Sequence, residues 1–206
     1  MHRRLALFLV ACCLFFAASC VQQYSSSDGP TAQEYFDSGM RSFGQEQYQA
    51  ALADFEQAVM KSPGFVEAQY YAGLAAWKLN MTEKAKKSFS DALGINPNYL
   101  KARESLGLLY CGVNDLGEAK RQLEAARALN SINPEVSLCL GRIYMMEGRC
   151  REALDVFGAG IRLDSSFLPL KNEYDAARRK CGAAKAPVVQ EKTFRGGAKA
   201  IDPSDF

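Results

Sequence analysis

Small and apolar residues recur along this chain at intervals of 34 positions, with polar residues between them. Three columns keep this spacing four times: Gly39, Gly73, Gly107 and Gly141; Ala51, Ala85, Ala119 and Ala153; Phe55, Phe89, Leu123 and Phe157. Within each interval the apolar positions fall on one face at helical spacing. The pattern predicts repeats of two short helices, and each repeat covers its apolar face only by stacking on its neighbours.

Turn and cap residues mark the predicted helix ends. Thr31 is followed three positions later by Glu34, which is the arrangement of a capping box at the start of a first helix. Asn80, Asn114 and Gly148 stand where the chain must turn inside the second, third and fourth repeats. These signals agree with the 34-residue period.

The columns resemble the tetratricopeptide repeat family, which has a small residue at position 8, Ala at 20, an aromatic residue at 24, Ala at 27 and Pro at 32. Position 27 is Ala58, Ala92, Ala126 and Gly160, and position 32 is Pro63 and Pro97, then Ser131 and Ser165. The resemblance implies an all-α fold, a solenoid of four helix-turn-helix repeats at 32–65, 66–99, 100–133 and 134–167. A capping helix is expected over 168–181. Residues 182–206 lack periodicity, and we expect a disordered tail there or a short docking motif.

In this family the first helix of each repeat lines a concave groove that binds peptides. Carried onto this chain, the groove positions are Phe36, Met40, Phe43, Tyr70, Leu74, Trp77, Leu108, Leu138 and Arg142. Their aromatic and aliphatic character in the N-terminal half favours an apolar peptide segment. The alternative is that rings such as Phe43 and Trp77 only pack between neighbouring repeats, because apolar residues at helical spacing are core by default.

The N-terminus has the features of an export signal. Arg3 and Arg4 precede a nearly uniform apolar run from Leu5 to Ser19, which is too short at about 22 Å of helix to cross a hydrocarbon core of about 30 Å. Small residues then lead to Cys20, and this ending resembles the lipobox of bacterial lipoproteins. We expect residues 1–19 to be removed as a signal peptide and Cys20 to be lipidated, with simple cleavage or a retained anchor as alternatives.

The resemblance to lipoproteins also implies a location. Residues 20–31 are a polar lipidated tether, and several acyl chains on Cys20 hold a protein stably on a membrane. Val21, rather than an aspartate, becomes the second residue of the mature chain. This implies sorting to the outer membrane of a Gram-negative cell, facing the periplasm.

Composition argues against catalysis and nucleic-acid binding. The one histidine, His2, lies in the segment expected to be removed, which excludes histidine-based catalysis from the mature chain. Removal of residues 1–19 also leaves 23 basic against 23 acidic residues, so no net field attracts phosphate backbones. Gly-rich phosphate loops and metal-spaced clusters are missing from the sequence. We expect no catalytic residues, cofactor, metal or small-molecule substrate, and an enzyme or cofactor carrier is the rival class.

Four cysteines remain after the signal and Cys20, and none forms a CxxC pair. Cys150 opens the second helix of the fourth repeat, and Cys181 closes the capping helix. Antiparallel packing places those ends side by side, so the pair is a candidate disulfide in an exported protein. The sequence leaves open whether Cys111 and Cys139 are oxidised or are small buried hydrophobes.

Together these features predict a membrane-anchored interaction scaffold for a protein partner in the cell envelope. Its architecture is similar to that of the tetratricopeptide pilotins, which assist secretin or type IV pilus assembly. Other lipoproteins of this kind act on outer-membrane proteins or cell-wall enzymes, and the sequence does not separate these systems.

Overall fold

The structure is a computed structural model that describes residues 29–182. In this part of the chain it contains nine α-helices and no strand, which confirms the all-α expectation. In chain order the helices are α2 (Ala32–Gly44), α3 (Tyr48–Lys61), α4 (Val66–Lys78), α5 (Thr82–Ile95), α6 (Leu100–Gly112), α7 (Leu116–Ala128), α8 (Pro134–Met146), α9 (Cys150–Leu163) and α10 (Leu168–Lys180). None of these helices is long and apolar enough to cross a bilayer.

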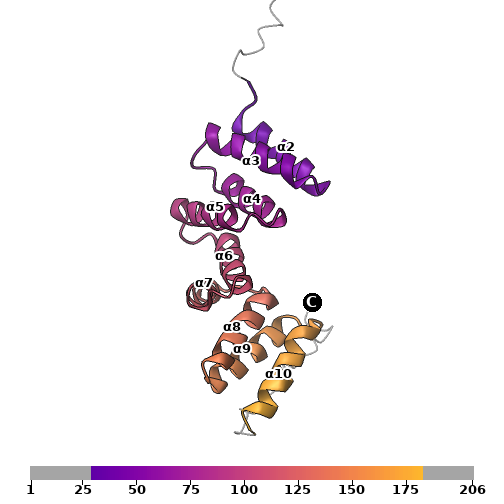
Figure 1. The fold of residues 1–206 in the computed structure, drawn as a ribbon, viewed down its shortest axis with the longest axis vertical. Coiled ribbons are helices and arrows are strands. Elements are labelled where there is room, and N and C mark those ends of the chain that lie inside the picture. The colour runs from indigo at the N-terminus through magenta and orange to yellow at the C-terminus, as the bar shows by residue number, and fades with distance from the viewer. Residues whose placement is uncertain (1–28, 183–206) are drawn as a thin grey trace, which may run out of the picture. The chain divides into compact units, whose positions relative to one another are not determined.

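The helices belong to two compact units, Met1–Ser131 and Ile132–Phe206. In the first unit α2 packs with α3, α4 with α5 and α6 with α7, so three consecutive helical hairpins follow one another (Figure 1). Each hairpin also contacts the next, through α3 with α4 and α5 with α6. In the second unit α8 and α9 form a hairpin, and α10 packs on both of them.

Each hairpin closes where a glycine of its first helix meets a large side chain of its second. A Cβ atom built on the glycine would lie 2.7 Å from Phe55 at Gly39, 2.6 Å from Phe89 at Gly73, 2.5 Å from Leu123 at Gly107 and 2.2 Å from Phe157 at Gly141. All four large side chains are buried. The glycine column is therefore required because the side chain at position 24 occupies the space of a Cβ.

The contact of Gly107 in the third hairpin adds a detail to the pattern of small-residue columns. The two small-residue columns suggest that Gly107 faces Ala119 across the hairpin. The atoms nearest to a Cβ on Gly107 instead belong to Leu123 and Gln122. Ala119 is buried all the same. The nearest contact of Gly107 is therefore with position 24, because the leucine side chain of the next helical turn reaches further towards α6 than an alanine methyl does.

Local signals place the helix ends as expected. Thr31 and Glu34 form the predicted capping box: the Glu34 N–H donates to Thr31 Oγ1 at 3.2 Å, and the Thr31 N–H donates to Glu34 Oε2 at 2.7 Å. Asn80, Asn114 and Gly148 adopt positive φ values of 60°, 61° and 71° at the turns. The corresponding residue of the first repeat is Glu46, which adopts φ 61° without the help of a glycine or asparagine.

The last helix, α10, closes the second unit. Leu170 and Ala177 are its two buried residues, and most of its other side chains are exposed. Gly160 stands where the other repeats have alanine, and a Cβ there would lie 2.6 Å from both Leu170 and Ser137. Close contacts with both α10 and α8 therefore leave no room for the alanine of the other repeats at this position.

Three expectations lie outside the described residues. They are the signal peptide at 1–19, most of the lipidated tether that begins at Cys20, and the tail that follows Gly182.

Candidate peptide-binding face

Six of the predicted groove residues lie on the first helices of the first unit and are half-buried. Phe36, Met40 and Phe43 come from α2, Leu74 and Trp77 from α4, and Leu108 from α6. Each of them therefore keeps part of its surface accessible. The amphipathic α2 has this arrangement because its opposite face buries Gly39 against Phe55.

Aromatic contacts hold the rings of α2 in place. The Phe36 ring centroid lies 4.9 Å from that of Phe65 and 5.7 Å from that of Tyr71. The Phe43 ring packs edge-on against Tyr48 at 5.2 Å and Tyr71 at 6.1 Å. One side of each ring therefore packs against neighbouring aromatic residues, as the alternative interpretation predicts. The exposed side is presented on a rigid support.

Tyr70 does not face open solvent, and the expectation that it lines an open groove is wrong. Its side chain is 8% exposed. Its ring centroid lies 5.8 Å from that of Phe89 and 5.5 Å from that of Tyr99. Burial raises the pKa of the Tyr70 hydroxyl, which also hydrogen-bonds with Ser105. The Tyr70 side chain packs against the third repeat, so this ring belongs to the core.

A pocket of about 330 Å³ lies at the end of α4. Its walls are Leu74, Trp77, Lys78 and Asn80, two of which are predicted groove residues. The Trp77 ring stands edge-on against buried Phe89 at a centroid distance of 6.2 Å, so its orientation is fixed from below. The pocket therefore combines an apolar floor with an ammonium group and a side-chain amide, a composition that suits part of a peptide.

In the second unit, Leu138 is half-buried and Arg142 is exposed on α8. Arg142 does not present a free guanidinium. Its Nε and one terminal nitrogen donate to Glu173 Oε1 of α10 at 2.9 and 2.7 Å. The capping helix thus engages the one charged residue among the predicted groove positions.

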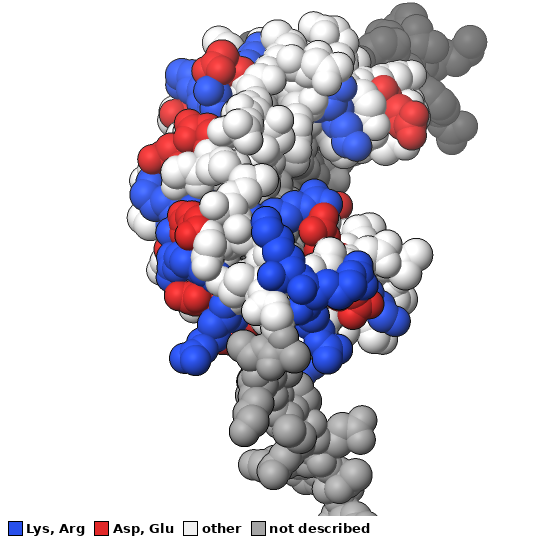
Figure 2. Space-filling view, turned by 60° about the horizontal axis from the view of Figure 1, so that its bottom comes forward, with Lys and Arg blue, Asp and Glu red and all other residues white. Residues whose placement is uncertain are grey.

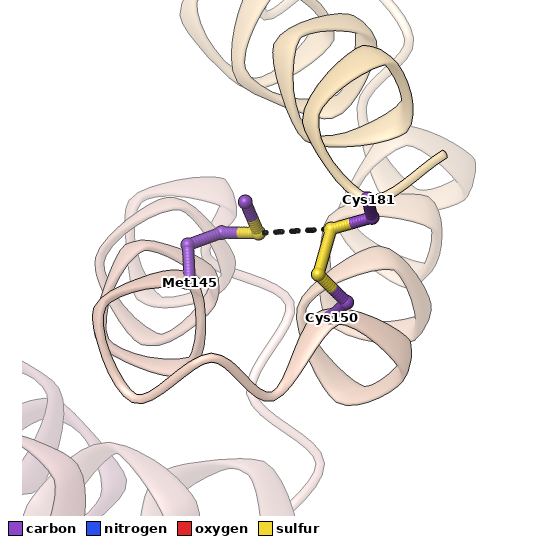
Figure 3. The surroundings of a disulfide bond; sticks show 3 residues. All are labelled: Met145, Cys150 and Cys181. Atoms are coloured by element: carbon purple, nitrogen blue, oxygen red, sulfur yellow. Dashed lines mark hydrogen bonds between the residues drawn. A yellow bond between two sulfur atoms is a disulfide. The ribbon is translucent and has the colours of Figure 1, made fainter. Parts of the chain in front are cut away.

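The proposed cysteine pair is joined in the structure. Cys150 and Cys181 form a disulfide with a Cα–Cα distance of 5.8 Å (Figure 3). Cys111 and Cys139 are each disulfide-bonded as well. Cys20, the proposed lipidation site, lies outside the described residues.

A second hollow of about 670 Å³ is not predicted by the groove positions, because these all lie on first helices. It lies along α3 and α5, where Val59, Met60, Pro63 and Ile95 supply apolar surface. Met60 is 72% exposed, and this large apolar side chain at the end of a second helix was the available signal. An ion pair between Lys84 and Glu56, 2.5 Å apart, bridges the two helices at its edge.

Charges are mixed along part of the surface shown in Figure 2. Acidic and basic side chains alternate along one margin of the face in Figure 2, beside uncharged surface. Ion pairs such as Arg121 with Glu118 and Lys87 with Asp91 join neighbours on single helices. Within residues 29–182, no three of the His, Cys, Asp and Glu side chains gather so that they could hold a metal ion.

Two family models, both described as tetratricopeptide repeat, match residues 42–111 and 104–166. Together they span most of the described chain. The chain belongs to the tetratricopeptide repeat family. It is therefore a scaffold of the kind that binds other proteins, in a family that is usually not catalytic.

Solved structures share the fold of this chain, whereas no curated protein matches the sequence. MamA residues 41 to the end from Desulfovibrio magneticus RS-1 superposes with a TM-score of 0.66 at 18% identity, covering 72% of this chain and 84% of that one. YrrB, described as a TPR protein with an unusual peptide-binding site, gives 0.61 at 20% identity and covers 82% and 86%. At these identities the likeness concerns the fold alone.

Proposed function

We propose that this tetratricopeptide scaffold is a lipid-anchored envelope protein that binds an apolar segment of a protein partner over α2, α4 and α6 of the first unit. The observation that carries the proposal is the pocket of Leu74, Trp77, Lys78 and Asn80 at the end of α4, together with the half-exposed side chains of α2. A large apolar residue of the partner enters over Trp77. Lys78 and Asn80 bind carbonyl or carboxylate oxygens of the same segment.

Rigidity favours this site over the other half-exposed surfaces. Trp77 rests on Phe89, and Phe36 rests on Phe65 and Tyr71, so neither ring loses much freedom when a partner covers it. Binding free energy concentrates in such aromatic anchors, and pre-organisation lowers the entropic cost of association. YrrB, with its peptide-binding site on the same fold, is a precedent for this use of the repeats.

The cysteines support the proposed compartment. Disulfides persist in oxidising compartments such as the bacterial periplasm and are rare in the cytosol. The Cys150–Cys181 bond therefore agrees with export by the N-terminal signal and with an anchor at Cys20. Among envelope systems we place secretin or pilus assembly first, because of the likeness to tetratricopeptide pilotins. Assembly of outer-membrane proteins and regulation of cell-wall enzymes are the competing outcomes.

Site-specific photo-cross-linking in intact cells tests the binding face. A cross-linking amino acid at Lys78 should capture one envelope protein, whereas the same amino acid at exposed Arg127 of α7 should not. The captured segment is then made as a peptide, and its affinity is measured. Trp77→Ala should weaken binding by about 2 kcal/mol, roughly thirtyfold, and Met60→Ala on α3 should leave the affinity unchanged. Equal capture at both positions, or equal affinity of both variants, contradicts the assignment.

The anchor is tested separately. Cys20→Ser should abolish labelling by radioactive palmitate and leave an unlipidated precursor. Cys12→Ser, which changes a cysteine inside the signal, should leave labelling intact. A Cys20→Ser protein that still takes up label and remains with the membrane fraction overturns the proposed lipidation.

A further inference from the structure

The two ends of α10 differ in how many non-covalent contacts they make with the rest of the second unit. Leu170, in its first turn, is fully buried and fills the space left by Gly160. Ala177, two turns later, is the one other buried residue, and a methyl group supplies little apolar contact. The ion pair from Glu173 to Arg142 is exposed to solvent and therefore contributes little. Tyr174, between the two buried residues, is half-buried, and its ring lies 3.9 Å from the position of a Cβ on Gly158 of α9. Non-covalent contacts thus hold the start of α10 more firmly than its end.

The covalent bond lies at the weak end. Cys181 follows α10 directly, and its disulfide joins it to Cys150, the first residue of α9 (Figure 3). The thioether of Met145 on α8 points at the bond, with its sulfur 3.8 Å from Cys181 Sγ. Neither sulfur carries a hydrogen in the oxidised form, so we treat this as a packing contact. The disulfide and Met145 together seat the end of α10.

The bond is open to attack. Cys150 and Cys181 are both partly exposed, so the bond lies close to solvent. Cys150 lies at the N-terminus of α9, where the helix dipole stabilises a departing thiolate. Arg178, Arg179 and Lys180 precede Cys181 and add positive charge on its side. Attack on Cys181 therefore releases Cys150 as the thiolate that the N-terminus of α9 stabilises.

Acidic neighbours reduce this effect near Cys150. Arg149 contacts Glu147 at 3.3 Å and Glu152 at 3.2 Å, so its charge is largely balanced. The helix N-terminus and the basic end of α10 are the contributions that remain.

We propose that the Cys150–Cys181 disulfide is a redox latch that controls the docking of the C-terminal half of α10. A dithiol reductant attacks one sulfur, and one half of the pair leaves as a thiolate. The second thiol of the reductant then breaks the mixed disulfide, so the reductant becomes a disulfide and the chain gains two electrons and two protons as two thiols. The end of α10 then leaves its seat beside Met145, while Leu170 keeps its start in place.

Opening of the latch exposes the surface of α8 and α9 that α10 covers. That surface includes the thioether of Met145 and the place where Ala177 is buried. The latch lies in the second unit and does not depend on the peptide-binding face proposed for the first.

Hydrogen–deuterium exchange of the full chain tests the latch. The variant Cys150→Ser/Cys181→Ser lacks this disulfide alone, so no reductant is needed and the disulfides at Cys111 and Cys139 stay intact. Amides of 173–181 should exchange about tenfold faster or more than in the oxidised wild type, while α8 and the core of α9 keep their protection. Adding a dithiol to the variant should not accelerate exchange in 173–181 further.

Two results overturn the proposal. Unchanged exchange over 173–181 means that Ala177 and the ion pair suffice to dock the helix. Equal loss of protection over α8, α9 and α10 means that the bond stabilises the whole unit and is not a latch. If the double variant does not fold, wild type is titrated with dithiol, and alkylation of Cys150 and Cys181 is followed by mass spectrometry. Exchange over 173–181 must then rise in step with alkylation, and a rise that follows modification of Cys111 and Cys139 instead refutes the latch.

Discussion

A methyl group added at Gly73 tests the packing that closes each hairpin. A Cβ there would lie 2.6 and 2.7 Å from two ring carbons of Phe89, so the ring must retreat by about 0.8 Å to reach an ordinary contact of 3.4 Å. Phe89 is fully buried and contacts Tyr70 and Trp77, so these neighbouring rings prevent its displacement. Overpacking of this kind costs about 1–3 kcal/mol, against a gain of about 1 kcal/mol from helix propensity. The two effects leave a net loss, and we expect Gly73→Ala to lower the free energy of unfolding by about 1 kcal/mol.

Gly94 provides the matched control. It also lies in a helix, α5, but nothing stands within 4 Å of a Cβ at this position. Gly94→Ala should therefore gain about 0.5–1 kcal/mol from propensity alone. Urea unfolding followed by fluorescence of Trp77, the one tryptophan of the chain, reports directly on the second repeat. A midpoint for Gly73→Ala at or above that of wild type would refute the reasoning.

A double mutant separates the contact from a general effect of the glycine. Phe89→Ala removes the ring carbons that a Cβ on Gly73 would meet. Gly73→Ala/Phe89→Ala should therefore lose less stability than the two single changes added together. Strict additivity would mean that the glycine and the ring do not interact.

Three further changes follow from the described contacts. Tyr70→Ala should lower the free energy of unfolding by about 3 kcal/mol or more, because a buried ring is lost. A melting temperature equal to that of wild type would mean that Tyr70 is a groove residue and not a core residue. Burial raises the pKa of Tyr99 to about 12, above its usual value near 10. The contribution of the neutral Tyr99 hydroxyl to the free energy of unfolding is therefore complete below pH 10 and is lost as the pH rises through 12. Absorbance titration of tyrosinate should lose its highest component in Tyr99→Phe. Glu46→Gly should gain about 0.5–1 kcal/mol, because relief of a left-handed backbone outweighs the added flexibility of glycine, and a lower urea midpoint would contradict this.

Much of the fold could be predicted because its signals are local or periodic. A capping box needs only Thr31 and Glu34, and a turn needs a residue such as Asn80 that tolerates positive φ. The 34-residue period determines the helix pairs, since each repeat contributes the same apolar face. Glu46 is the exception, because it adopts a positive φ at a turn where the other repeats have asparagine or glycine.

Contacts between repeats could not be read in the same way. The periodicity places Tyr70, Leu74 and Trp77 on nearby parts of α4, yet Tyr70 is buried while the other two line a pocket. The difference depends on the rotation of one hairpin relative to the next, which brings Tyr99 over Tyr70 and leaves Trp77 partly open. Periodicity gives the direction of a side chain from its own helix and not what stands beyond it.

The sequence by itself therefore determined the repeats, their helices and their glycine column, because these follow from spacing along one chain. Only the tertiary structure decided that Gly107 meets Leu123, that Arg142 is engaged by Glu173, and which aromatic rings remain accessible. Those outcomes depend on how far individual side chains reach across a hairpin or between hairpins. That reach is a property of close packing in three dimensions, where a shift of one helical turn or one ångström changes which atoms touch.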